Sequence, residues 1–372
     1  MRRVIVGVVV GMLFAAVPVP GQPVAGPAKA KATTPEIPFE SVPNFFKMPS
    51  GIYMGEGVGV ATNSKGNVYV YSRSGETRLF EFDKTGAFVK EFGVGSYGFS
   101  FAHAVRVDKD DNVWAVDEGT NIIQKFSPDG KLLMVLGKRP DPLEQLSLTP
   151  GGGQYSGANR PYSFHRQTDI GWDPQGNIFV SDGYGDSRVV KYDKNGRFIK
   201  AAGTRGNGPL QFSTPHAISV DAKGIVYVAD RGNSRIVVLD NDLNQKAVYD
   251  NVGAPYAGSN RPYSFHRQTD IGWDPQGNIF VTDGQPPLTG AAQAASASQS
   301  GPAPGSTRGH QVYKFSPDGK LLMVLGKRPD PLDQLAMTPG GGQYSGANRP
   351  YTFHRQTDIG WDPQGNIFVS DG

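Results

Sequence analysis

A short phrase recurs along this chain of 372 residues: an alternating apolar run ends in Asp, a tight turn ends in Gly, and a second apolar run ends in another Asp. The six copies begin at Gly59, Val105, Ile170, Ile218, Ile271 and Ile359, and the first of them is the most diverged. Repeats at a regular spacing constrain the architecture of a chain more strongly than any single segment does. The repeated unit is therefore the strongest constraint on the fold.

Each copy has the period of a β-strand. Val226 and Val228 fall on one face of such a strand, and Tyr227 and Ala229 fall on the other. Sequences such as Asp-Lys-Asn-Gly and Ser-Pro-Asp-Gly supply tight turns between the runs. The unit is a four-stranded antiparallel meander of about 40 residues. Because one such sheet cannot bury both of its faces, the copies must pack radially, and the sequence predicts an all-β, six-bladed β-propeller.

The N-terminus carries a predicted export signal. Residues 1–25 have the pattern of a signal peptide: Met1-Arg2-Arg3, then an apolar run too short to leave a membrane span after cleavage, with Gly21 or Ala25 as the small residue. Residues 26–37, rich in Pro, Ala and Lys, predict a flexible leader, and residues 38–372 form the propeller. We expect a secreted or periplasmic monomer. The absence of Cys does not test this expectation.

Composition excludes one class of partner. The formal net charge is +3, and the basic residues form no run or patch of the kind that binds nucleic acid. The 49 Gly and 29 Pro residues indicate a turn-rich chain, as a propeller requires. A peptide or small molecule, or a protein partner, remains the expected ligand.

The last blade is predicted to be incomplete. Residues 125–183 reappear as residues 314–372 with four differences in 59 positions, and the second copy stops where the first continues into two more strands. The segment 39–48 is expected to add one strand to this blade, which leaves one absent. Residues 285–309, rich in Ala, Ser, Gly and Pro, interrupt the fifth copy and are predicted to be a disordered insertion.

Two histidines occupy one register of the repeat. His103 and His216 precede the first apolar run of the second and fourth copies, where the other copies carry Val58, Thr168, Thr269 and Thr357. The first strand of each blade lines the channel of a propeller, so both side chains are expected to point toward a common axis. Such a pair can share a metal ion. The alternative is a pair of structural histidines that bind neighbouring backbone.

Three segments carry a resemblance to a known family. The motifs at 179–188 (FVSDGYGDSR), 212–216 (FSTPH) and 228–233 (VADRGN) resemble the lyase domain of peptidylglycine α-amidating enzymes, a six-bladed propeller of NHL repeats. The resemblance covers roughly residues 59–253 and is most specific over 170–240. It implies a propeller of the NHL/TolB-like kind and a peptidylamidoglycolate lyase activity that splits peptidyl-α-hydroxyglycine into a peptide amide and glyoxylate.

The same resemblance implies roles for five residues. The zinc ligands map onto His103 and His216, and the active-site tyrosine maps onto Tyr184, which as a phenolate would take the hydroxyl proton of the substrate. The two arginines that hold the substrate carboxylate map onto Arg231 and Arg73. Zinc is thus the implied cofactor, and the resemblance also allows a structural calcium ion.

The chain departs from that family at the third zinc ligand. The family takes this histidine from the last blade, where the present chain has Thr357. His165, His266 and His354 lie three residues earlier in their copies and are expected to be loop or rim residues. Zinc held by two protein ligands binds weakly. Two functions therefore remain: a zinc lyase impaired by this loss, or a non-catalytic secreted propeller that binds a peptide, a glycan or a protein.

Overall fold

The computed structural model describes the residues that carry the repeats. These are residues 42, 44–73, 75–139, 161–249, 268–273, 277–283, 311–316, 321–325, 356–363 and 365–371. The predicted signal peptide, leader and insertion 285–309 lie outside the described residues.

Six antiparallel sheets follow one another along the chain. The first two are β1 (Gly57–Thr62), β2 (Val68–Ser72), β3 (Arg78–Phe82) and β4 (Phe88–Phe92), then β5 (Ala102–Val107), β6 (Val113–Asp117), β7 (Ile122–Phe126) and β8 (Leu132–Gly137). The next two are β9 (Asp169–Trp172), β10 (Ile178–Asp182), β11 (Arg188–Tyr192) and β12 (Phe198–Ala202), then β15 (Pro215–Val220), β16 (Val226–Asp230), β17 (Arg235–Leu239) and β18 (Gln245–Tyr249). The last two are β19 (Gln268–Trp273), β20 (Ile279–Asp283), β21 (Gln311–Phe315) and β22 (Leu321–Leu325), then β23 (Gln356–Trp361) and β24 (Ile367–Asp371).

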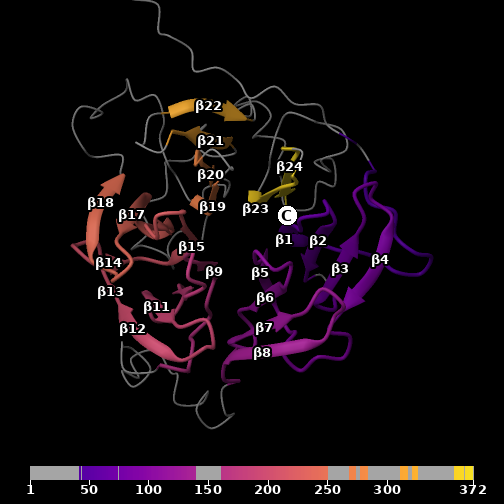
Figure 1. The fold of residues 1–372 in the computed structure, drawn as a ribbon, viewed down its shortest axis with the longest axis horizontal. Helices are drawn as coiled ribbons and strands as arrows, with labels where there is room; N and C mark the ends of the chain where they lie inside the picture. The colour runs from indigo at the N-terminus through magenta and orange to yellow at the C-terminus, as the bar shows by residue number, and fades with distance from the viewer. Residues whose placement is uncertain are drawn as a thin grey trace, which may run out of the picture. The chain divides into compact units, whose positions relative to one another are not determined.

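The first strand of every sheet lies at the centre of the ring. Strand β1 contacts β5, and the contacts continue through β9, β15, β19 and β23 back to β1. Figure 1 shows these strands near the centre and β4, β8, β12, β18 and β22 at the periphery. The predicted six-bladed β-propeller is thus confirmed, and its last blade has two strands within the described residues, as the sequence predicted.

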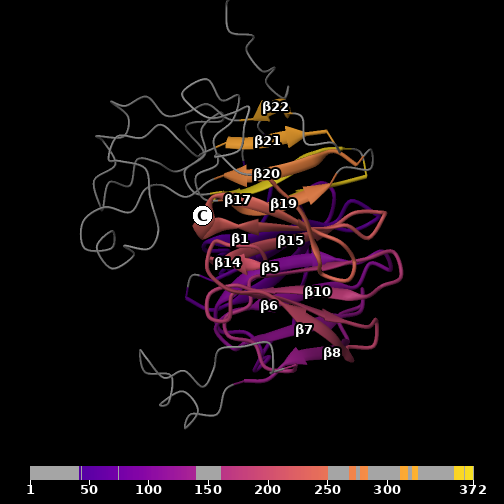
Figure 2. The ribbon, with the colours of Figure 1, turned by 90° about the vertical axis from the view of Figure 1, so that its left-hand side faces the viewer.

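Each of the first four blades buries its second strand completely. Every residue of β2, β6, β10 and β16 is buried, because neighbouring blades cover both faces. The outermost strands β4, β8, β12 and β18 keep exposed positions. Aromatic residues pack between blades; the rings of Trp114 and Trp172 have centroids 5.4 Å apart, and those of Tyr227 and Trp273 are 4.3 Å apart. Figure 2 shows the blades from the side, with their strands in successive layers.

The first Asp of each repeat fixes its turn. Asp173 Oδ1 accepts the backbone N–H groups of Gln175 and Asn177 at 3.0 and 2.8 Å, so the carboxylate replaces backbone partners within the turn. Gly176 has a φ of 85°, in the left-handed region that glycine adopts without strain. The same arrangement recurs at Asp221, the first Asp of its repeat, and at Asp83, which lies in the turn between β3 and β4.

The segment before β1 differs from expectation. Its described residues contain no strand of the last blade; Lys47 instead forms a single parallel bridge with Ala87 in the first blade. The rings of Phe45 and Phe368 have centroids 5.9 Å apart, and those of Phe46 and Phe82 are 4.5 Å apart. Burial of aromatic side chains across the junction of the first and last blades, rather than strand pairing, therefore holds this segment.

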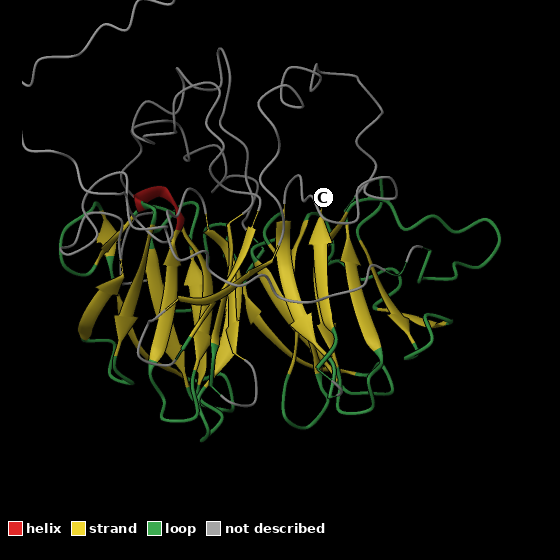
Figure 3. Cartoon of the chain, turned by 90° about the horizontal axis from the view of Figure 1, so that it is seen from above, coloured by secondary structure: helices red, strands yellow, loops and turns green. Residues whose placement is uncertain are grey.

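The strands run between two sets of loops, as Figure 3 shows. The start of each inner strand and the end of the second strand lie at the same end, since Ala102 pairs with Asp117 and Pro215 with Asp230. The 3₁₀-helix η1 (Arg231–Asn233) follows β16 at this end, and the short strands β13 (Thr204–Arg205) and β14 (Gln211–Phe212) precede β15. Residues that begin the inner strands are thereby brought next to residues that follow the second strands.

Candidate functional site

Both predicted histidines are the extra residue of a β-bulge. The pairing of β5 with β6 shifts between Ala102 and Ala104, and that of β15 with β16 shifts between Pro215 and Ala217. A bulge leaves one residue outside the ladder and redirects its side chain. His103 and His216 are the residues at these shifts, so the shared register predicted from the repeats is confirmed.

The two imidazoles and Tyr184 form one cluster. The ring centroids of His103 and His216 are 4.6 Å apart. The Tyr184 Oη lies 3.2 Å from Nε2 of His216 and 3.5 Å from Nε2 of His103. The structure thus brings together three residues that are separated by 81 and 32 positions in the sequence.

A hydrogen bond defines the donor atom of one histidine, and burial defines the charge of the other. Nδ1 of His216 donates to the carbonyl oxygen of Thr269 at 2.7 Å, and its Nε2 faces Tyr184. Burial, followed by the positive charges of Arg231 and Arg73, lowers the pKa of His103 to about 3. His103 is therefore uncharged at neutral pH, the form in which an imidazole binds a metal.

Glycines on both sides of Tyr184 let its loop pass through a narrow space. A Cβ on Gly183 would lie 2.2 Å from the carbonyl oxygen of Pro215, and one on Gly185 would lie 2.1 Å from the His165 ring. The loop is held by the backbone N–H of Gly185, which donates to the carbonyl oxygen of His165 at 3.0 Å. This close approach explains the Gly-Tyr-Gly sequence after β10.

Two guanidinium groups lie over the Tyr184 ring. The Cζ atoms of Arg166 and Arg231 are 4.6 and 5.2 Å from the ring centroid. Arg166 donates to Glu118 at 3.1 Å, whereas no carboxylate among the described residues lies within ion-pair distance of Arg231. Arg231 is also only 4% exposed, and its Nε has no hydrogen-bond partner within the described chain.

Arg73 occupies a different environment. Its guanidinium forms two hydrogen bonds of 3.2 Å with Glu56 and lies 4.5 Å from the centroid of the Phe101 ring. Its charge still contributes to lowering the pKa of His103. The two arginines predicted from the sequence therefore differ, because Arg73 is already neutralised by a carboxylate and Arg231 is not.

Glu118 is a residue of this site that the sequence analysis missed. It is 3% exposed, and burial raises the pKa of its carboxyl group against the opposing charges of Arg166, Arg73 and Arg231. Glu118 follows Asp117 in the repeat just as Arg231 follows Asp230, so its position was a usable signal. Arg166, which lies two residues before the inner-strand register of its blade, offered no such signal.

Comparisons with known proteins show which type of repeat the chain carries. Residues 212–239 match the model of the NHL repeat. The chain is a β-propeller whose fourth blade matches the NHL repeat. It resembles a probable peptidyl-alpha-hydroxyglycine alpha-amidating lyase of Caenorhabditis elegans, with 29% identity over 52% of this chain and 57% of the worm protein. It also resembles NHL repeat-containing protein 3 of Mus musculus, with 30% identity over 76% of this chain and 65% of the mouse protein.

The propeller therefore spans somewhat under two thirds of these relatives. A solved structure from Bacteroides thetaiotaomicron, a structural genomics protein of unknown function, shares the fold with a TM-score of 0.52 and 13% identity over 87% of this chain and 68% of that one. Within the described residues, the propeller contains no helix long and apolar enough to cross a membrane.

The one other histidine among the described residues does not join the pair. His165 lies in the bend before β9, as a loop residue was predicted to, and its Nδ1 is 3.6 Å from Asp186 Oδ1. His266 and His354 lie outside the described residues. Thr357, at the register of the third ligand, has its hydroxyl 2.7 Å from that of Ser370. No group of three or more His, Cys, Asp or Glu side chains in the described part is placed to hold a metal ion.

Proposed function

We propose that the cluster around Tyr184 is a lyase site for a peptide that ends in α-hydroxyglycine. The observation that carries this proposal is the convergence of His103, His216 and Tyr184 beside Arg231, a buried cation without a carboxylate partner in the described chain. The relatives named as amidating lyases support the same class of reaction. The substrate carboxylate would supply the anion that Arg231 lacks.

The reaction requires one proton to move twice. Tyr184, whose Oη lies 3.2 Å from Nε2 of His216, can act as a phenolate and take the proton of the substrate hydroxyl. The carbon–nitrogen bond breaks as the hydroxyl oxygen forms the carbonyl of glyoxylate. The electron pair goes to nitrogen, and the proton returned by Tyr184 completes the peptide amide. The guanidinium groups of Arg166 and Arg231 stabilise the negative charge that develops on the phenol oxygen.

The two histidines fit a zinc ion as two of its ligands. Both Nε2 atoms face the same point, and His216 Nδ1 is committed to the Thr269 carbonyl in the way that orients metal-binding histidines. A bound zinc ion would polarise the substrate oxygen as a Lewis acid. Because Thr357 replaces the third histidine, we propose that zinc binds weakly and that glyoxylate release is slower by on the order of a hundredfold or more than with a complete ligand set.

Glyoxylate release from a peptidyl-α-hydroxyglycine tests this function. The protein should release glyoxylate slowly, and Tyr184→Phe should lower the rate by roughly 100-fold or more, because the proton relay is lost. A Tyr162→Phe variant, changed at an exposed tyrosine, is the matched control and should keep the parent rate. Glyoxylate release that Tyr184→Phe leaves unchanged would contradict the proposed role of this residue.

Thr357, whose hydroxyl lies 2.7 Å from that of Ser370, stands at the register of the third zinc ligand and favours a second function, a binding module. In that case the protein binds the peptide carboxylate but releases no glyoxylate, with or without added zinc. We also propose export through residues 1–25, which N-terminal sequencing of the mature protein from the periplasm or the medium would test.

A further inference from the structure

Arg106 stands at a level of the channel where the other inner strands carry small residues. In the pairing of inner and second strands, Arg106 lies opposite Trp114 as Gly171 lies opposite Phe179. The residues at the same register of the other blades are Ala61, Gly171, Ser219, Gly272 and Gly360. Five of the six strands thus place little or no side chain there, and the channel has room for one long side chain.

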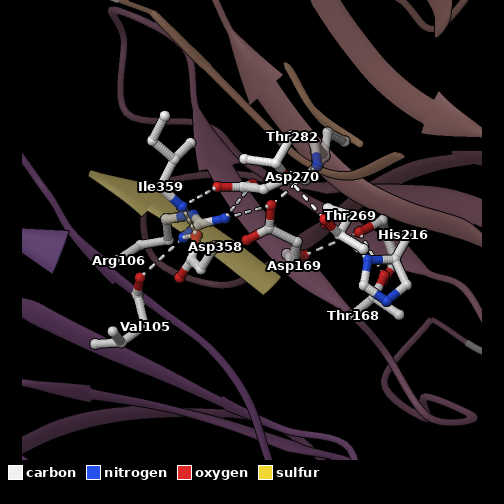
Figure 4. Close-up of polar contacts among 12 residues, drawn as sticks. Val105, Arg106, Thr168, Asp169, His216, Thr269, Asp270, Thr282, Asp358 and Ile359 are labelled. Atoms are coloured by element: carbon white, nitrogen blue, oxygen red, sulfur yellow. Dashed lines mark hydrogen bonds and ion pairs between the residues drawn. The ribbon is translucent and has the colours of Figure 1, made fainter. Parts of the chain in front are cut away.

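The guanidinium of Arg106 binds three carboxylates from three other blades. Nη2 lies 2.9 Å from Asp169 and 2.7 Å from Asp270, and Nη1 lies 2.6 Å from Asp358. Figure 4 shows the guanidinium between these side chains. The three carboxylates are only 1–2% exposed, so most water is excluded from them. The positive charge of Arg106 compensates their negative charges there.

Each carboxylate also binds the backbone of the following blade. Asp169 Oδ2 accepts the N–H of Ile218 at 3.0 Å, and Asp270 Oδ2 accepts that of Ile359 at 2.9 Å. Asp358 Oδ2 accepts the N–H of Val60 at 2.8 Å, across the point where the ring closes. Together with Arg106 on the second blade, these contacts link all six blades at one level.

The cluster needs a cation to stay buried. Burial raises the pKa of Asp169 to about 6, and it raises the pKa of Asp270 well above its ordinary value, although Arg106 opposes both shifts. Without Arg106, three carboxylates would face one another with no compensating charge. A buried group of carboxylates in such a position normally pairs with a basic side chain or coordinates a metal.

A calcium ion was the cation that the family resemblance allowed, and oxygen atoms of the kind it binds are present. Asp169, Asp270 and Asp358 supply carboxylates, and the Val105 carbonyl oxygen lies 3.1 Å from Arg106 Nη1. These oxygens are already bound by the guanidinium, so an added calcium ion does not fit. We propose that Arg106 is the resident cation of the channel and replaces a structural metal, which makes the closure of the ring independent of calcium.

The position of Arg106 also separates the two ends of the channel. His103 precedes it by three residues on β5, toward the loops that carry Tyr184 and Arg231. A cavity of about 270 Å³ borders Arg106 and Asp270 and is lined by residues of all six inner strands, among them Trp172 and Trp361. The charge network therefore lies between this cavity and the histidine pair.

Thermal unfolding with and without calcium tests the replacement. The parent protein should unfold at the same temperature in excess EGTA and in excess calcium chloride. Arg106→Ala should unfold at a lower temperature in EGTA and recover part of the loss in calcium, because the three freed carboxylates then form a cation site. Titration calorimetry should show saturable calcium binding to Arg106→Ala and no calcium binding to the parent protein.

Two further variants make the result specific. Arg106→Ala combined with Asp358→Asn should lose the recovery, because one carboxylate of the site is gone. Arg78→Ala, which breaks the ion pair of 2.6 Å with Glu91 away from the channel, should show no response to calcium. A parent protein that calcium stabilises, or an Arg106→Ala chain that calcium does not rescue, whether it folds or not, overturns the proposal.

Discussion

Arg231 gives the sharpest test of the site, because its expected effect can be worked out from its surroundings. The side chain is 4% exposed, lies over the Tyr184 ring and has no carboxylate partner in the described residues. A hydrogen bond between this cation and a ligand carboxylate contributes about 1.5–3 kcal/mol, which corresponds to roughly 10- to 150-fold in affinity. Arg231→Ala should lose this amount.

The assay compares two unreactive peptides that differ only at the C-terminus, one a carboxylate and the other a carboxamide. Titration calorimetry should show that the parent protein prefers the carboxylate, and that Arg231→Ala loses the preference by weakening the carboxylate peptide alone. Arg231→Lys, which keeps the charge, should retain part of the preference. The comparison does not depend on turnover, so it applies to a lyase and to a binding module.

Arg73 supplies the matched control. Its charge is already engaged by Glu56 at 3.2 Å, so Arg73→Ala should change the preference for the carboxylate by a few-fold at most. The reasoning would be refuted if Arg231→Ala kept the full preference, or if it weakened both peptides equally. The second outcome would mean that Arg231 supports the loop rather than the ligand.

Three further changes have defined outcomes. His216→Ala removes one of the two Nε2 atoms at the cluster, so zinc retained by protein purified without chelator, measured by elemental analysis, should fall to background; unchanged zinc would contradict the metal site. Gly185→Ala places a Cβ 2.1 Å from the His165 ring, so calorimetry should show a lower melting temperature, and an unchanged one would mean that the loop can shift. Burial raises the pKa of Asp182 from 3.8 to about 6, despite Arg188, so its contribution to stability is present at low pH and is lost as the pH rises through about 6. The melting temperature of the parent protein should therefore fall as the pH rises through about 6, and in Asp182→Asn it should fall less steeply. An equal slope of melting temperature against pH in both proteins would show that other groups cause the fall.

The repeats predicted the fold and part of the site because both depend on local sequence. The turn at Asp173 is set by its own carboxylate, and the bulge that carries His103 recurs with the repeat. A register shared between copies is therefore a register shared in space, which is why His103 and His216 were predicted to meet.

Contacts across blades were not predictable in the same way. Glu118 and Arg166 are 48 positions apart and pair only because the second and third blades are neighbours. Asp169, Asp270 and Asp358 share one register of the repeat, but nothing in the repeat indicates that Arg106, 252 positions from Asp358, binds all three. The segment at Phe45 was assigned to strand pairing because a propeller usually closes with such a strand, yet its ring packs against Phe368 and no strand forms there in the described residues.

The charge network around Arg106 divides the axis of the propeller into two parts, with the histidine pair on one side and the cavity lined by Trp172 and Trp361 on the other. In the proposed lyase, the substrate would therefore enter through the loops that carry Tyr184, and both products would leave by the same route.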